Sequence, residues 1–348
     1  MQRSISQAPF FVEEMNLNMS MKQKGDLSIE EQDGLNLLAL LPCPIKGAVE
    51  SAFENYIELE NIKFNCLIES NANNNLKYDE CIKNFKTIDD IPDIVITSGL
   101  NNFYGQEFKK NFIDKGYFES VSINNPTDKL KEIKDPKGVY NIIAVNLLVI
   151  VVNLERLGEL PMPDKWGDLL SPKFENKVVI RGEQDKFCET TLLTIFKEYG
   201  EDGVRKLGKS VVDGWHPAQM VNSIAKKSQE GPVISVMPYF YAKTISNQEK
   251  VKIIWPKEGA IISPVTMLVK KSKAKELQKL TKFFLEDEVG EICVKSDFPS
   301  LNPKVNLKLP KEACFNWIGW DFIDKYDVTE VVEGLNKIFS QSFHEKNN

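Results

Sequence analysis

The sequence has few of the residues and motifs that mark common enzyme and metal sites. It contains two histidines, His216 and His344, and none of its six cysteines forms a C-x-x-C pair. A zinc finger or a thioredoxin-like motif is therefore not indicated. G-x-S-x-G, G-x-G-x-x-G and H-E-x-x-H are all absent, and we expect no nucleotide-binding loop. These absences favour binding over catalysis, and we expect no cofactor.

The sequence also has no apolar run of the ~20 residues that a membrane-spanning helix needs. The strongest candidate, Val139–Asn153, is interrupted by Asn141 and Asn146. The formal net charge is -6, which argues against a nucleic-acid partner. We therefore expect neither membrane insertion nor nucleic-acid binding.

The N-terminal residues bear on where in the cell the protein is located. Met1–Gln32 is polar, without a basic-then-apolar signal and without a lipobox cysteine. As it stands, the sequence predicts a cytoplasmic protein, or an extracytoplasmic one if the N-terminus has been truncated. The scattered cysteines suggest free thiols in a reducing compartment, although their even number leaves disulfides open.

Two long apolar segments organise the rest of the chain. Val139–Asn153 is rich in β-branched residues, which is typical of a strand buried on both faces. Ala260–Val269 is a second such run, and Pro264 predicts that this strand is bent or lies at a sheet edge. Because the two segments lie about one lobe apart in sequence, they predict a two-stranded hinge.

Four stretches in a fixed order resemble a known family. They are PDIVITSG, VNLERLGELPMPDKWGDLLSPKFENKVVI, TLLTIFKEYGEDGVRKL and EGAIISPVTMLVKKSKAKELQKLTKFFLEDEVGEI. In this order they resemble the bilobed solute-binding proteins of ABC transporters, in the group that includes ferric-iron binders. The resemblance covers most of the chain from Leu35 onward.

The resemblance implies a fold and a function. The fold is α/β, with two α/β lobes joined by two crossover strands, periplasmic binding protein-like, type II. The function is to close the lobes around a small-molecule ligand, without catalysis, as a monomer that an ABC permease recognises. We expect an N-terminal extension and linker at 1–34, lobe 1 at 35–145 plus 259–348, and lobe 2 at 146–258.

Candidate ligand-binding residues of the first lobe follow its strands, because ligands of open α/β sheets bind beyond the carboxyl ends of strands. The alternatives are a proline-stiffened turn with Lys46 in water, and Ser98 as a helix cap. The candidates, with one from the long strand, are Pro42, Cys43, Lys46, Thr97, Ser98, Tyr104 and Asn146.

The second lobe offers a corresponding set. Relatives often have a small Ser/Gly/Thr turn for an anion here, whereas this chain has Glu183, Asp185 and Glu189. That departure counts against a simple anionic ligand, although acidic residues also favour a first helical turn through the helix dipole. The candidates are Lys186, Cys188, Glu189, Thr190, His216, Pro238, Tyr239 and Tyr241.

Three alternatives stay open. Tyr239 and Tyr241 stand at the point of the chain where iron-binding relatives carry adjacent tyrosines, whose phenolates bind the iron. Cys43 and Cys188 could hold a soft metal with Met220 or His216, or form a redox-gated latch, when the lobes close. Cys43 and His216 could also act as nucleophile and base.

Overall fold

The computed structural model describes residues 35–71, 82–121, 126, 128–183, 186–226, 230–305 and 309–345. The predicted N-terminal extension and linker, Cys81 and Asp185 lie outside the described residues, as does the side chain of Glu183. Among the described residues, no helix combines the length and the apolarity needed to cross a bilayer.

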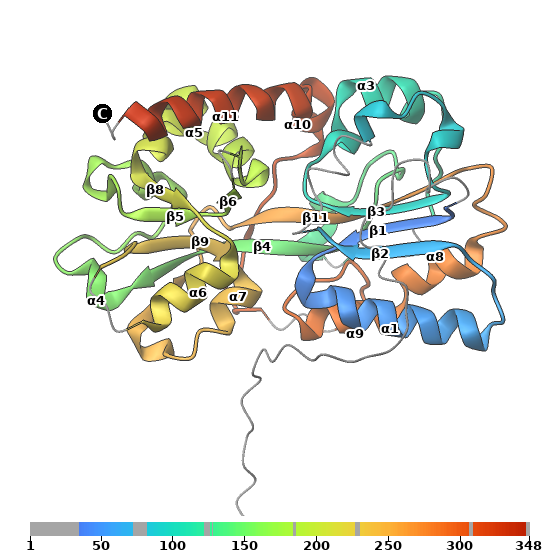
Figure 1. The fold of residues 1–348 in the computed structure, drawn as a ribbon, viewed down its shortest axis with the longest axis horizontal. Helices are drawn as coiled ribbons and strands as arrows, with labels where there is room; N and C mark the ends of the chain where they lie inside the picture. The colour runs from blue at the N-terminus through green and yellow to red at the C-terminus, as the bar shows by residue number, and fades with distance from the viewer. Residues whose placement is uncertain are drawn as a thin grey trace, which may run out of the picture. The chain divides into compact units, whose positions relative to one another are not determined.

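A ten-stranded mixed sheet runs through the molecule (Figure 1). Its main order is β2-β1-β3-β11-β4-β9-β5-β8, with β10 beside β4 and β12 beside β11. The strands are β1 Leu37–Leu41, β2 Cys66–Ser70, β3 Ile94–Ser98, β4 Asn141–Asn153, β5 Val178–Ile180, β8 Val211–Gly214, β9 Ile234–Pro238, β10 Val251–Ile254, β11 Ala260–Val269 and β12 Phe315–Asn316. A separate hairpin joins β6 Gly182–Glu183 to β7 Lys186–Phe187.

Helices cover both faces of this sheet (Figure 1). They are α1 Cys43–Leu59, α3 Gln106–Phe108, α4 Leu154–Leu157, α5 Glu189–Ser210, α6 Pro217–Ala225, α7 Tyr239–Lys243, α8 Gln278–Leu285, α9 Asp287–Lys295, α10 Trp320–Lys325 and α11 Val328–Glu345. The predicted helix at 48–59 begins five residues earlier, at Cys43. Pro42 and Pro44 explain this start, since proline is tolerated before and within a first helical turn.

The two long strands pair with each other, as the sequence predicts. The first half of β4 pairs antiparallel with β11, and its second half pairs with β9 and β10. The second half of β11 pairs with β3. Each long strand therefore belongs to both halves of the sheet. The first half is built around β2, β1 and β3, and the second half around β9, β5 and β8.

Pro264 lies where β11 changes partners. It stands opposite Val145, and pairing with β3 begins one residue later, at Val265 opposite Ser98. The register shifts between Val265 and Thr266. The predicted irregularity is present, although β11 lies inside the sheet and not at its edge.

The C-terminal helix α11 packs against α5 on the second half of the sheet. The Phe339 ring lies 4.2 Å from the Phe187 ring, and a Cβ on Gly208 of α5 would lie 2.7 Å from the Phe339 carbonyl oxygen. The other end of α11 reaches the first half, where Thr329 Oγ1 donates to Asn102 Oδ1 over 3.3 Å. The helix therefore contacts both halves.

Candidate functional site

A cleft opens where the strand ends of the two halves face each other across β4 and β11. It contains about 570 Å³ of space, solvent at its mouth included. Its walls come from strand ends and helix starts in both halves, and its floor comes from the two long strands. The lining residues are Pro42, Cys43, Pro44, Asn71, Ser98, Gly99, Asn146, Arg181, Glu189, His216, Pro217, Pro238, Tyr241, Ser263 and Phe298.

The floor carries two polar side chains in register. Asn146 is the one residue of β4 that is not buried, and Ser263 is the one residue of β11 that is not buried. The two stand opposite each other in the β4–β11 ladder. All other residues of both strands are buried, so these two side chains present polar groups to the cleft while their neighbours along each strand do not.

The first wall carries Cys43 at the start of α1. Cys43 Sγ and Ser70 Oγ, at the end of β2, share a hydrogen bond of 2.7 Å. Ser98 ends β3 and its hydroxyl donates to the Leu40 carbonyl oxygen over 3.3 Å. The parallel strands β1, β2 and β3 thus bring three small polar side chains to one edge, as parallel topology requires.

The second wall carries the two charged side chains of the cleft. Arg181 follows β5 and Glu189 begins α5, and the hairpin β6–β7 lies between them. The Cys188 N–H donates to the Arg181 carbonyl oxygen over 2.9 Å, which closes the base of this hairpin. Arg181 and Glu189 are therefore close in space although eight residues separate them.

Glu189 reaches across to the first half of the molecule. A Cβ built on Gly99 would lie 2.5 Å from Glu189 Oε1 and 3.8 Å from Ser263 Oγ. Gly99 has a φ of +85°, and its N–H donates to the Pro264 carbonyl oxygen. Glycine therefore provides both the left-handed backbone and the room that the carboxylate occupies.

His216 and Tyr241 complete the second wall. His216 caps α6: its Nδ1 accepts from the Ala218 N–H, and its own N–H donates to Gln219 Oε1. A ring nitrogen that accepts a hydrogen bond carries no proton, so the imidazole in this arrangement is neutral. Burial raises the pKa of Tyr241, the nearby Cys43 raises it further, and the Arg181 guanidinium lowers it.

Eight of the fifteen predicted site residues line this cleft. They come from six different elements of the fold, and the structure brings them to one place. They are Pro42, Cys43, Ser98, Asn146, Glu189, His216, Pro238 and Tyr241.

The other predictions for the first lobe need correction. Tyr104 is fully buried, with its hydroxyl 2.5 Å from Thr266 Oγ1 and its ring 4.7 Å from the Tyr140 ring. Thr97 is also buried. Lys46 pairs with Glu50 on the next turn of α1, 2.6 Å away. These three side chains serve the core or the helix surface and do not line the cleft.

The predictions for the second lobe are corrected in the same way. Lys186 is exposed on β7, and Cys188 and Thr190 are buried. Burial raises the pKa of the Cys188 thiol, with the Glu189 charge as a second cause.

Tyr239 does not join Tyr241 in the cleft. Its ring packs edge-on against Trp255, with 5.5 Å between ring centroids. Both residues belong to the short helix α7, where residues two apart point in different directions. The adjacent phenolate pair of the iron-binding alternative is therefore not formed. No group of three His, Cys, Asp or Glu side chains in the described residues could hold a metal ion.

Several cleft residues are absent from the predicted set. They include Arg181, Gly99, Ser263 and Asn71, which directly follows β2. The position directly after a buried strand is the signal that could have identified Arg181.

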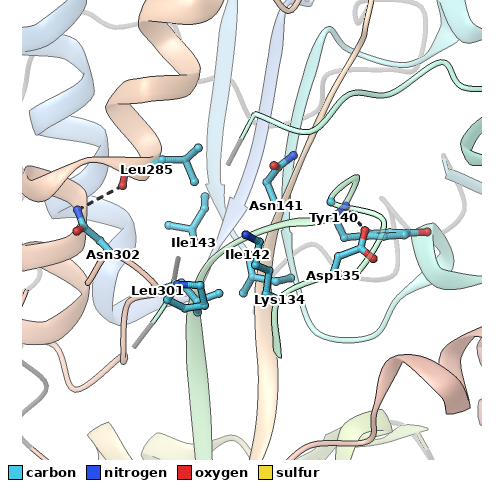
Figure 2. A pocket seen from close by; sticks show the side chains of 11 residues that line it. Lys134, Asp135, Tyr140, Asn141, Ile142, Ile143, Leu285, Leu301 and Asn302 are labelled. Carbon is cyan, nitrogen blue, oxygen red and sulfur yellow. Dashed lines mark hydrogen bonds between the residues drawn. The ribbon is translucent and has the colours of Figure 1, made fainter. Parts of the chain in front are cut away.

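A second hollow lies beside the start of β4 (Figure 2). Its polar groups already have protein partners. Asp135 Oδ2 accepts from the Tyr140 N–H at 2.9 Å, and Asn302 Nδ2 donates to the Leu285 carbonyl oxygen and to Asp287 Oδ1. Such groups stabilise loops, so the cleft is the better candidate site.

One sequence pattern has the spacing of a phosphate-binding loop. Gly203–Ser210, GVRKLGKS, matches G-x-x-x-x-G-K-S. It forms the last two turns of α5, where a phosphate-binding loop would instead follow a strand and precede a helix. The spacing is therefore present in the sequence, but here it lies within a helix and does not form a loop between a strand and a helix.

A cleft at strand ends, floored by two strands that pass between two α/β lobes, defines a type II periplasmic-binding-protein fold. A family model described as bacterial extracellular solute-binding protein matches residues 89–326. The chain therefore belongs to the bacterial extracellular solute-binding protein family, whose members serve ABC transport systems.

Solved structures agree on the fold at low sequence identity. A Clostridium perfringens ABC transporter protein has a TM-score of 0.60 at 18% identity, with 88% of this chain and 99% of that chain covered. AfuA from Actinobacillus pleuropneumoniae, solved with fructose 6-phosphate, has a TM-score of 0.63 at 15% identity, covering 89% and 98%. Trichodesmium FutA, solved with iron and citrate, has a TM-score of 0.60 at 15% identity, covering 88% and 98%. No curated protein matches the sequence.

Proposed function

We propose that the chain binds one small polar solute in the cleft and closes its two lobes around that solute. The observation that carries this proposal is the position of Asn146 and Ser263, polar and accessible on otherwise buried hinge strands. Apolar side chains at both positions would bury more surface. Polar groups kept at the pivot, between walls from both halves, fit a ligand that touches both lobes.

Closure follows from differential affinity. A ligand shifts an open–closed equilibrium only if it makes more contacts in the closed form. Residues 35–145 with residues 259–327 would move as one body and residues 146–258 as the other, with β4 and β11 between them. Helix α11 packs on α5 and would move with the second body, while its Thr329 contacts the first.

The test uses the full chain purified without exogenous ligand. Native mass spectrometry should reveal a co-purifying small molecule, which should be released unchanged on denaturation. Asn146→Leu should abolish its retention, whereas Asn36→Leu, at the end of β1 away from the cleft, should retain it. A chain that carries no small molecule and gives no thermal shift with any solute mixture contradicts the proposal.

We further propose that an ABC permease recognises the solute-loaded form outside the cytoplasm. The description of the family as extracellular supports this location. Cell fractionation that recovers the protein solely in the cytosol would contradict it. The enzymatic alternative, with Cys43 as nucleophile and His216 as base, gains no support. Cys43 Sγ is hydrogen-bonded to Ser70 Oγ, and His216 Nδ1 accepts the N-cap hydrogen bond of α6.

A further inference from the structure

Helix α11 is joined to the first half of the molecule near its N-terminal end. Thr329 Oγ1 donates to Asn102 Oδ1 over 3.3 Å. One turn further along the helix, Glu333 Oε1 lies 2.9 Å from Lys83 Nζ. Asn102 follows the cleft-lining Gly99 by three residues. These contacts therefore attach α11 to the part of the first half that carries one wall of the cleft.

The same face of α11 is joined to the second half. Asn336 follows Glu333 by three residues, and residues three and four apart are neighbours on a helix surface. Asn336 Oδ1 accepts a hydrogen bond from the Phe187 N–H over 3.0 Å, and the Phe339 and Phe187 rings lie 4.2 Å apart. Phe187 precedes the cleft-lining Glu189 by two residues. One helix therefore holds both walls of the cleft.

The two walls touch each other in this structure. A Cβ on Gly99 would lie 2.5 Å from Glu189 Oε1, so a side chain of the second half is packed against the backbone of the first. The lobes are therefore together, with the α11 contacts formed. The four residues that join α11 to the first half are not among the cleft-lining residues. Changing them alters no group that lines the cleft.

Rotation of the lobes would break the contacts between α11 and the first half. Helix α10 belongs to the first half, where the Trp320 Nε1–H donates to the Ile133 carbonyl oxygen over 3.1 Å. Helix α11 packs along α5 in the second half (Figure 1). The chain passes between these helices at 326–327, and Glu333 lies about 9 Å further along α11. Turning α11 with the second half therefore carries Glu333 and Thr329 away from their partners.

We propose that α11 is a strap that favours the closed arrangement of the lobes, with Thr329 and Glu333 as its positioning residues. The inference rests on the lobe closure of the proposed function and adds a contribution from outside the cleft. A neutral hydrogen bond shifts an equilibrium about two- to tenfold. An ion pair between exposed side chains, as Lys83 and Glu333 are, shifts it less than about fivefold. The strap therefore favours closure and still allows opening, through which a solute enters.

The test measures the two lobe arrangements by single-molecule energy transfer on the full chain, dialysed to remove any co-purifying solute and with no solute added. One dye is attached in each half, through p-azidophenylalanine in place of Leu59 and of Leu154, which are both exposed. We expect the parent chain to populate a closed and an open arrangement. The ratio of the two populations is the quantity compared among variants.

Thr329→Val combined with Glu333→Gln should lower the closed-to-open ratio by about threefold or more. Thr329→Ser keeps the hydroxyl and should keep the ratio of the parent chain. Glu330→Gln makes the same charge change as Glu333→Gln at an exposed position of α11, and it should leave the ratio unchanged.

Three results overturn the strap. They are a parent chain that is wholly open without solute, an unchanged ratio in the double variant, and a Thr329→Ser ratio as low as that of the double variant. Native mass spectrometry of the undialysed parent chain tests the proposed function separately. A parent chain that retains its co-purifying solute keeps that function even when the strap fails, so failures of the two proposals are distinguishable.

Discussion

Asn146 and Ser263 stand opposite each other on the two hinge strands, and each is the single accessible residue of its strand. Folding alone gives no reason for this pair, because the neighbouring positions on both strands are buried and mostly apolar. The pair is better explained by a ligand that needs polar groups at the pivot.

Replacing the serine tests this explanation. Ser263→Val should change the free energy of unfolding by less than about 1 kcal/mol, because valine suits a strand. It should weaken binding of the co-purifying solute by about tenfold or more, since two methyl groups take the place of a hydroxyl. Ser272→Val, at an exposed position, is the control. If Ser263→Val bound the solute with unchanged affinity, the Ser263 side chain would not be part of the binding site.

Gly99→Ala should impair both folding and binding. The new Cβ would lie 2.5 Å from Glu189 Oε1, at a φ of +85°. Left-handed backbone costs a residue with a Cβ about 1–2 kcal/mol, before any displacement of Glu189. Chemical denaturation and titration measure the two effects. Adding Glu189→Ala should relieve the steric part alone, and Gly47→Ala, which meets nothing within 4 Å, should not destabilise the protein.

Tyr104→Phe should lower stability without altering ligand affinity. It removes a hydroxyl that pairs with Thr266 in a fully buried setting. Leaving the Thr266 hydroxyl without that partner should cost about 1–3 kcal/mol. Denaturant unfolding and ligand titration separate the effects. A loss of affinity with unchanged stability would return Tyr104 to the binding site.

Thiol reactivity should report on the cleft. Cys43 and Cys314 are exposed, whereas Cys188 and Cys293 are buried, and burial raises the pKa of Cys293 to about 12. In a Cys81→Ser background, a colorimetric disulfide reagent should modify Cys43 and Cys314 first. Bound solute should protect Cys43 and leave Cys314 reactive. Equal protection of both thiols would indicate a global change instead of occupancy of the cleft.

Tyr199 should make stability fall in alkaline solution. The Tyr199 hydroxyl donates a hydrogen bond to Glu258 Oε1 over 2.9 Å. Burial, as the larger cause, and this hydrogen bond raise the pKa of Tyr199 to about 12. The unfolded chain loses this proton near pH 10. The contribution is therefore complete below pH 10 and disappears as the pH rises toward 12.

Denaturant unfolding at several pH values checks this sign. Tyr199→Phe should cost about 1 kcal/mol below pH 10, and the difference from the parent chain should shrink above it. The exposed Tyr117→Phe should show no such pH dependence. A difference that grows with pH would mean that the hydroxyl titrates below its unfolded value.

The sequence by itself determined the elements with strong local signals. β-branched runs gave the two hinge strands, and proline explained the irregularity of β11, because both effects act through the backbone of a few residues. Positions at or just beyond strand ends predicted Cys43 and Ser98, since parallel sheets place their strand ends together. The resemblance of ordered segments then gave the family.

Only the tertiary structure decided which candidates meet. Ser98 ends β3 and Tyr104 follows it, yet Tyr104 packs into the core and Ser98 faces the cleft, because chain distance from a strand end does not fix side-chain direction. The backbone of Arg181 lies near Glu189 because the β6–β7 hairpin closes between them. Helix α11 packs on α5, although the segments that precede it in the chain belong to the other half of the sheet. Such contacts join residues far apart in the chain, and local patterns carry no record of them.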